Sequence, residues 1–282
     1  MIFFPEKKKR KKFSHRLPAW EKVSGYSGRN IVHDGKYLEA VKYSMPASDT
    51  SLAGKKIVFF SDLHWTGGSN REKNILREAA AFIAGFQPDI IISGGDLISY
   101  ASRIQHGIDA LNALPEAENK LAVVGNWERY KTWIPDSRWK EYYAGAGYNL
   151  LINQMYCAGG FCYYGIDDIK SGNPEINADF NGKCNVLLAH SPDTAVLAGR
   201  GDVLKKINLI LCGHTHAGQI RLPFIGALKT SSRYHLKFDY GHFIHSKAGT
   251  HMMVSAGIGM SCVPVRIFCR PEIVFIEFVN AI

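Results

Sequence analysis

The chain has 282 residues, which is enough for one large domain or two small ones and for a substantial hydrophobic core. Its composition, 46% hydrophobic and 21% charged, is that of an ordinary globular protein and excludes a largely disordered chain. The net charge of +9 is mostly local, because residues 1–16 carry seven Lys or Arg against Glu6 and leave +3 for the other 266 residues.

Residues 1–50 are expected to form a basic tail and an irregular lead-in, ahead of one domain over residues 51–282. The basic run at residues 7–12 and the large apolar side chains around it favour contact between residues 1–20 and an anionic membrane surface. Nucleic acid would attract the same charges, and a solubilising tail is the simpler alternative. The flanking apolar residues are Phe3, Phe4, Phe13, Leu17 and Trp20.

Two features predict a cytoplasmic protein. The apolar start Met1–Phe4 is too short for a signal peptide, and no apolar run approaches the roughly 18 residues of a membrane span. The six cysteines form no C-x-x-C pair, and Cys184 and Cys212 lie in apolar strand-like runs, which suits reduced, buried thiols better than a disulfide framework. A tail that binds lipid would make the protein peripheral on the inner face of the membrane.

Strand and helix patterns alternate in the first half, and the second half is richer in strands, with no internal repeat or linker. Ser69-x-x-Glu72 resembles a capping box at a helix start. We therefore expect one α/β domain with a largely parallel sheet. The expected strands cover residues 57–60, 90–92, 121–124, 161–165, 185–189, 207–212, 251–255 and 273–278, and the expected helices follow Ser69, contain Ile104 to Leu114, and cover residues 193–198.

Oxygen and imidazole donors follow the ends of these strands. Ligands bind outside the carboxyl ends of the strands in open α/β sheets, so the donors should converge on one edge. Each alone has a structural explanation, as a turn residue, a cap or a loop histidine, but together they predict a metal site. The seven donors are Asp62, His64, Asp96, Asn126, His190, His214 and His216.

The pair His214-x-His216 shows how two metals could be bound. Side chains at i and i+2 of an extended backbone point to the same side, so both imidazoles could face one site, although such a pair alone is more typical of a surface turn. Carboxylate, imidazole and amide donors suit manganese, iron or zinc. Seven donors exceed one tetrahedral ion but fit two divalent ions about 3.5–4 Å apart, with manganese the first expectation.

Five motifs, in this order, resemble the calcineurin-like metallophosphoesterase superfamily from about residue 55 to the C-terminus. They are Asp-x-His, Gly-Gly-Asp, Gly-Asn-x-Glu, an isolated His after a strand, and Gly-His-Thr-His. The runs at residues 218–223 and 259–272 are similar more narrowly to its YkuE-type branch, which includes enzymes that cleave the pyrophosphate of UDP-2,3-diacylglucosamine in lipid A synthesis.

This resemblance implies a four-layer α/β/β/α sandwich with a dinuclear site above the sheets. It implies a hydrolase in which a metal-held hydroxide attacks phosphorus in line while both ions stabilise the developing charge. The three ligands that belong to the second metal alone, Asn126, His190 and His214, are also the expected catalytic residues. The implied ligands are Asp62, His64, Asp96 and His216 for the first metal, and Asp96, Asn126, His190 and His214 for the second.

One position departs from the family pattern. The family usually has His after the Asn, where it protonates the leaving oxygen, whereas this chain has Trp127. Indole only donates hydrogen bonds and cannot act as a general acid. A pyrophosphate expels phosphate, whose last pKa is about 6, and needs little protonation. Trp127 therefore favours diphosphates or activated esters over alkyl monoesters, unless His235, His242 or His245 supplies the acid.

The leading functional hypothesis is a metal-dependent pyrophosphatase or phosphoesterase that acts on an amphiphilic, lipid-linked nucleotide sugar. A general phosphodiesterase or nuclease is the alternative enzyme, but the nearly neutral body does not favour binding of a polyanion. A non-catalytic, metal-bound scaffold is the alternative outside enzymes, and the presence of all seven donors is unfavourable to it.

Overall fold

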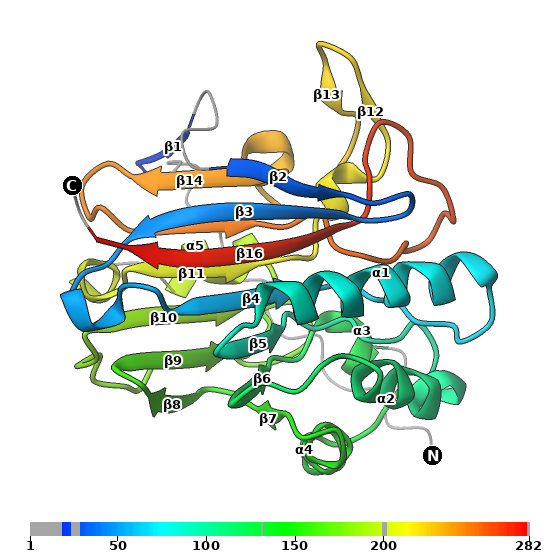
Figure 1. The fold of residues 1–282 in the computed structure, drawn as a ribbon, viewed down its shortest axis with the longest axis horizontal. Helices are drawn as coiled ribbons and strands as arrows, with labels where there is room; N and C mark the ends of the chain where they lie inside the picture. Colours follow the sequence, from blue (N-terminus) through cyan, green and yellow to red (C-terminus); the bar gives the residue numbers. More distant parts are fainter. Residues whose placement is uncertain (1–18, 24–28, 131, 199–201, 281–282) are drawn as a thin grey trace, which may run out of the picture.

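Two seven-stranded sheets dominate the computed structural model, which describes residues 19–23, 29–130, 132–198 and 202–280 (Figure 1). The first sheet has the order β2 (Arg29–Asp34), β3 (Glu39–Pro46), β16 (Glu272–Val279), β4 (Lys56–Phe60), β5 (Ile90–Ser93), β6 (Asn119–Ala122) and β7 (Asn149–Leu150). The second has the order β1 (Trp20–Lys22), β14 (Gly241–His245), β15 (His251–Val254), β11 (Leu209–Cys212), β10 (Cys184–Ala189), β9 (Phe161–Ile166) and β8 (Gln154–Ala158).

The centre of each sheet is parallel. Strands β4, β5, β6 and β7 pair in parallel, and so do β9, β10, β11 and β15. Strand β16 runs antiparallel to β4 and parallel to β3. Because parallel strands end at the same edge, the loops after β4, β5 and β6 leave one sheet together, and those after β9, β10 and β11 leave the other together.

The sheets stack with helices outside them, which confirms the predicted four-layer sandwich. Helices α1 (Asn70–Phe86), α2 (Ile104–Asn112) and α4 (Asp136–Gly145) share a core with the outer face of the first sheet. Helix α5 (Pro192–Ala198) and the 3₁₀ segments η3 (Asp202–Lys206) and η5 (His235–Phe238) cover the second. Side-chain alternation builds the layers, since Val186 and Leu188 face the other sheet while Leu187 packs outward.

The prediction of an irregular lead-in is wrong where the structure describes it. Strand β3 has an alternating burial pattern and pairs with β16 along its whole length, so residues 29–46 belong to the first sheet. Trp20 is buried at 5% exposure and packs edge-on against Phe238, so it is no part of a membrane-binding tail. The basic run and the other apolar residues of the tail lie outside the described residues.

Helix α1 starts as predicted. Ser69 is its N-cap, and the Ser69 and Glu72 side chains form the reciprocal hydrogen bonds of a capping box. Helix α2 starts at Ile104 but ends at Asn112. The sequence patterns missed α4, the short helix α3 (Asn126–Tyr130) and strands β8 and β14.

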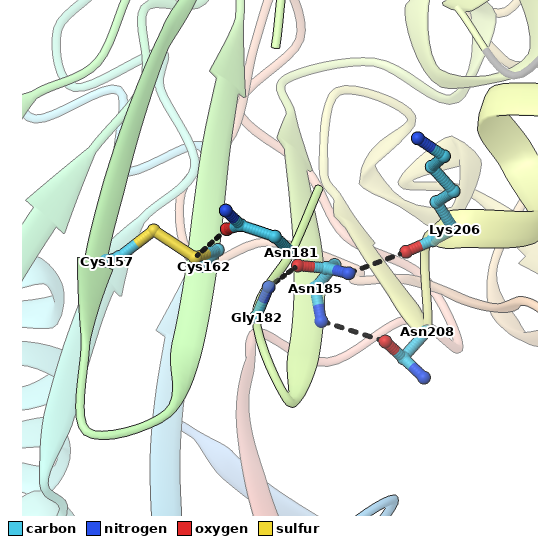
Figure 2. Close-up of a disulfide and its surroundings, with 7 residues drawn as sticks. All are labelled: Cys157, Cys162, Asn181, Gly182, Asn185, Lys206 and Asn208. Carbon is cyan, nitrogen blue, oxygen red and sulfur yellow. Dashed lines mark hydrogen bonds between the residues drawn. A yellow bond between two sulfur atoms is a disulfide. The ribbon is translucent and has the colours of Figure 1, made fainter. Parts of the chain in front are cut away.

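A disulfide joins Cys157 on β8 to Cys162 on β9, so the expectation of reduced thiols is wrong for this pair (Figure 2). The hairpin turn between the strands sets these residues opposite each other in the antiparallel register. Cys184 and Cys212 are free and buried, as predicted. Nearby, the Asn185 side chain accepts a hydrogen bond from Gly182 N in the turn before β10 and donates one to the Lys206 carbonyl at the end of η3. These two bonds stabilise the turn against that segment.

No helix within the described residues has the length and apolar character that crossing a bilayer requires.

Candidate metal centre

All seven predicted donors lie at or beyond the carboxyl ends of parallel strands, and six of them form two compact groups. In each group the ligand atoms lie within 4.8 Å of one another. The donors follow β4 (Asp62, His64), β5 (Asp96), β6 (Asn126), β10 (His190) and β11 (His214, His216).

The first group contains Asp62, His64 and His216. His64 Nε2 and His216 Nε2 are 3.1 Å apart, and His216 Nε2 is 3.5 Å from Asp62 Oδ1. Two imidazole nitrogens and a carboxylate oxygen therefore point at one another from the ends of β4 and β11, which lie in different sheets. This donor set is one that manganese, iron and zinc accept.

The second group contains Asp96, His190 and His214. His190 Nε2 lies 3.2 Å from Asp96 Oδ2 and 3.0 Å from His214 Nδ1. The same Asp96 Oδ2 is 3.6 Å from His64 Nε2 in the first group. Asp96 thus lies between the groups, where a carboxylate can bridge two ions.

His214 and His216 belong to different groups, but not through the extended geometry that the sequence suggested. Their φ angles are 72° and 51°, in the left-handed region, so the loop after β11 is irregular. A Cβ at Gly213 would lie 2.1 Å from Ser61 Oγ and 2.3 Å from Asp62 Oδ2, so only glycine fits there. Asp62 and Asp96 also have positive φ, and such backbone strain clusters at functional sites.

Buried polar atoms test whether these residues fit metal ions. All six grouped residues are buried. Asn126 Oδ1 and Asp62 Oδ1 are also buried and have no hydrogen-bond partner in the described part of the chain, an arrangement that is costly unless another group binds them. Trp127 N donates to Asp96 Oδ1 at 2.8 Å, which places the neighbouring Asn126 beside the second group. The donors therefore fit two ions.

The electrostatics favour the metal-binding form at four of the donors, whereas burial raises the pKa of Asp62, and the charge of Asp96 outweighs burial and raises the pKa of His190 to about 10. Burial lowers the pKa of His64, His214 and His216, which favours the neutral imidazole that binds metals. Burial alone would raise the pKa of Asp96, but the charge of His190 and its hydrogen bond outweigh burial and hold that pKa below its usual range. The Asp96 carboxylate is therefore ionised.

Neighbouring groups orient the ligands. His190 Nδ1 lies 2.8 Å from the Gly94 carbonyl and must donate to it, which leaves Nε2 as the nitrogen that faces the centre. His64 Nδ1 contacts Ser99 Oγ at 3.1 Å and is oriented in the same way. His214 N donates to Asp62 Oδ2 at 2.9 Å and so links the loops after β4 and β11.

Three residues at the centre escaped the sequence analysis as site residues. Glu128 accepts from three backbone N–H groups beside Asp96, and its place in Gly-Asn-x-Glu was the available signal. Lys170 Nζ lies 2.5 Å from His214 Nε2, and its position shortly after β9 was a weaker signal. Arg266 Nη2 lies 3.4 Å from His216 Nδ1, and no sequence pattern identified it.

The alternative acids lie elsewhere. His242 Nε2 contacts His251 Nδ1 at 2.8 Å on β14 and β15, and His245 packs against Trp20. His235 is exposed in η5. Within the described residues, no hydrogen bond or ring contact joins any of these three histidines to either ligand group. The Trp127 indole, by contrast, packs edge-on against His64 with ring centroids 5.3 Å apart.

A cavity of about 370 Å³ adjoins the first group at His64. It lies between the start of α1 and the loop that follows β15. Its walls are mainly apolar, with Trp65 and Ile75 on one side and Met260 and Pro264 on the other. Arg71, which is exposed, contributes a cationic group to the lining.

Comparisons with known proteins find relatives of this chain among the phosphoesterases. A family model described as calcineurin-like phosphoesterase matches residues 55–218. The metallophosphoesterase YkuE of Bacillus subtilis is 30% identical over 78% of this chain and 77% of its own length. The phosphodiesterase YaeI of Escherichia coli is 26% identical over 91% and 93%. A dimetal phosphatase from Danio rerio aligns with a TM-score of 0.44 at 11% identity, covering 73% of this chain and 88% of that chain.

The family match and the two groups of donors support two divalent metal ions. The matched residues make up more than half of the chain and contain all seven strand-end donors, five in the first four motifs and His214 and His216 in the fifth. This chain therefore belongs to the calcineurin-like phosphoesterase family and is a metal-dependent phosphoester hydrolase.

Proposed function

We propose that this chain hydrolyses the diphosphate of a lipid-linked nucleotide sugar, of the kind represented by UDP-2,3-diacylglucosamine in lipid A synthesis, with manganese as the metal and iron or zinc as alternatives. The two ions, when bound, supply Lewis acidity and an activated water. The residues proposed to hold them are those predicted from the sequence: Asp62, His64, Asp96, Asn126, His190, His214 and His216.

The position of Trp127 carries the preference for a diphosphate. Its indole packs against His64 at the centre, and its backbone N–H binds Asp96, so a side chain that cannot protonate a leaving group occupies the place beside the ligands. A leaving phosphate needs little protonation, whereas an alkoxide needs it strongly. Diphosphates and activated diesters therefore suit this site better than alkyl monoesters.

The cavity beside His64 supports an amphiphilic substrate. Its volume of about 370 Å³ lies within the range of about 300–1,000 Å³ typical of small-molecule sites. Its apolar walls suit hydrocarbon, and because His64 is one of the lining residues, a hydrocarbon group bound there would lie near a phosphate at the metals. We propose that an acyl chain of the substrate lies there.

Replacing Trp127 by His should raise turnover of a plain alkyl phosphate monoester by about 10²-fold, because a positioned imidazole can protonate the leaving oxygen. Turnover of UDP-2,3-diacylglucosamine should change little. The measurement is hydrolysis of this substrate, of bis-p-nitrophenyl phosphate and of the monoester in manganese-supplemented buffer. Trp127→Phe is the matched control and should gain no monoesterase activity. If the unaltered chain cleaves the monoester as fast as the nucleotide sugar, the proposed function is wrong.

Filling the cavity should separate substrates by their lipid. Met260→Trp adds bulk to the cavity wall, so we expect KM for UDP-2,3-diacylglucosamine to rise about tenfold or more while bis-p-nitrophenyl phosphate is unaffected. Met260→Leu keeps the volume and is the control. If Met260→Trp loses equal activity on both substrates, the substitution acts on the metal centre, and the cavity does not bind the substrate's lipid.

A general phosphodiesterase remains the second candidate, because the relative YaeI bears that name. The comparison of substrates distinguishes the two, since a general enzyme would prefer the diester and be insensitive to Met260→Trp. We also propose that the segment before Trp20 contacts an anionic membrane surface through the basic run at residues 7–12, and a partner of that kind suits a lipid-linked substrate.

A further inference from the structure

Two loops next to the metal centre expose a group of large apolar side chains, which we name the apolar tip. One loop is the hairpin of β12 (Arg221–Leu222) and β13 (Gly226–Ala227), which rises from the body in Figure 1, and the other joins β15 to β16 beside it. Phe224 is fully exposed, and Phe268 and Ile225 are 73% and 68% exposed. The apolar tip consists of Leu222, Phe224, Ile225, Leu228, Val263, Val265, Ile267 and Phe268.

The two loops form one surface because they are hydrogen-bonded together. Gln219 donates through Nε2 to the carbonyls of Ser261 and Val263, and its Oε1 accepts from Ser261 N. Arg221 N donates to the Ile267 carbonyl, and Ile267 N donates to the Gln219 carbonyl. The exposed side chains of both loops are thus held in a fixed relation to one another.

The two loops that carry the apolar tip contain basic side chains and no acidic ones, although Arg270 at the end of the second loop pairs with Asp34 and Glu39 of the first sheet. Residues 219–238 and 255–271 contain no Asp or Glu. Lys229 and Arg233 are exposed next to the hairpin. The nearest carboxylates in sequence are already engaged, since Asp239 pairs with Arg221 and Lys22. A protruding apolar surface on two loops that carry basic and no acidic side chains complements an anionic lipid surface, in which apolar side chains enter the acyl boundary and cations meet headgroups.

We infer that the apolar tip inserts into an anionic lipid bilayer and docks the metal centre against it. Its projecting shape distinguishes this surface from a groove for a peptide, and its basic border distinguishes it from a purely apolar contact between copies of the chain. The inference does not depend on the proposed substrate, and it uses residues far from the basic run at residues 7–12.

The apolar tip is attached directly to the ligands. His216 begins the segment that leads to the hairpin, and Gln219 follows it by three residues. From the other loop, Arg266 donates to the carbonyls of Ala256 and Gly257 and contacts His216 Nδ1 at 3.4 Å. The cavity beside His64 is lined by Met260 and Pro264 of this loop. A bilayer bound at the apolar tip would therefore lie close to the cavity and the ligands.

Sedimentation of the full chain with vesicles tests this inference. We expect the chain to pellet with vesicles of 70% phosphatidylcholine and 30% phosphatidylglycerol and much less with pure phosphatidylcholine. Phe224→Ser with Ile225→Ser should weaken partitioning at least tenfold, because the inserted apolar area is lost. Ile31→Ser with Val32→Ser, two exposed apolar residues of β2, is the matched control and should bind as the unaltered chain does.

Cys262 offers a second readout that does not depend on a substitution in the apolar tip. It is the exposed free cysteine among the described residues, lies in the same loop as Val263, and can carry an environment-sensitive dye such as NBD. Anionic vesicles should shift the dye emission to shorter wavelength and raise its intensity. Cys262→Ser, labelled in parallel, should give no such signal and so controls for labelling at other cysteines.

Each of the following three outcomes would overturn the inference. Unchanged vesicle binding by the Phe224/Ile225 variant, with no shift at Cys262, would mean that the apolar tip does not enter the bilayer. If replacing the basic residues at 7–12 by Gln in the full chain abolishes binding while the Phe224/Ile225 variant retains it, the tail alone binds lipid. If the unaltered chain does not bind vesicles but sediments as a dimer, and the Phe224/Ile225 variant sediments as a monomer, the apolar tip is an interface between two copies.

Discussion

Replacing Asp96 by Asn is expected to lower kcat by about 10³-fold or more while the fold is retained. Asp96 Oδ2 lies 3.2 Å from His190 Nε2 and 3.6 Å from His64 Nε2, so this carboxylate is the group that both sets of donors share. Asn keeps the shape and still accepts from Trp127 N, but it removes the negative charge that a bridging ligand supplies. The measurement is hydrolysis of bis-p-nitrophenyl phosphate with manganese, beside metal content by mass spectrometry.

Asp193→Asn is the control for loss of a buried carboxylate. Asp193 is fully buried and binds Ser232 Oγ and Arg233 N, outside both groups of donors. Its variant should keep two ions per chain even where stability falls. If the Asp96→Asn protein is folded, binds two ions and hydrolyses the substrate at the normal rate, Asp96 does not bridge the two ions. Lost hydrolysis with retained folding, in contrast, separates an enzyme from a non-catalytic metal-bound scaffold.

The strand ends could be predicted from the sequence because each depends on a short local pattern. The apolar runs before Asp62, Asp96 and His190 fit buried parallel strands, and the rule for α/β sheets then places their following residues at one edge. The capping box at Ser69 is equally local. Six of the seven donors consequently lie in the two groups that the structure forms, and the role of each as a ligand remains a prediction.

Features that depend on distant pairing could not be predicted. Strand β3 is held by β16 from the other end of the chain, so the apolar and polar alternation over Val41 to Met45 could indicate a strand but not the sheet to which it belongs. The same limit applies to Arg266, which reaches His216 only because the loop after β15 folds back over the centre. The disulfide of Cys157 with Cys162 depends on a hairpin that the strand analysis missed.

The His214–His216 loop shows a correct outcome reached through the wrong geometry. The two side chains were expected on one side of an extended strand end, but positive φ angles at both residues turn the backbone instead. The constraint that sets this conformation is Gly213, whose missing side chain admits Ser61 and Asp62. A contact between segments far apart in sequence thus decides the loop, and a periodic pattern cannot reveal it.

Removing the Glu128 carboxylate is expected to destabilise the protein more than any other single change at the centre that leaves the ligands in place. Glu128 accepts from the backbone N–H groups of Asp96, Leu97 and Gly125, all buried. Glu128→Ala leaves these three N–H groups and the Tyr143 hydroxyl without this partner, at a cost of about 1–3 kcal/mol each. We expect the free energy of unfolding, measured by urea denaturation, to fall by about 3 kcal/mol or more, and metal affinity to fall with it because Asp96 N is one of the released groups.

Glu128→Gln is the matched variant, and its pH dependence tests the charge separately from the hydrogen bonds. Burial first, and then the negative charge of Asp96, raise the pKa of Glu128 to about 7 from its usual value near 4.5. Between these values the folded protein binds this proton more tightly than the unfolded chain, so this group's contribution to stability is greatest below pH about 4.5 and is lost as the pH rises to about 7. Gln cannot ionise, and its variant should lack that loss while keeping one acceptor oxygen. If the Gln variant and the unaltered protein lose equal stability as the pH rises, other groups cause the loss. If the stability of the Gln variant depends less on pH, the loss comes from Glu128, a charge that the fold retains at a cost in order to hold the Asp96 backbone in place.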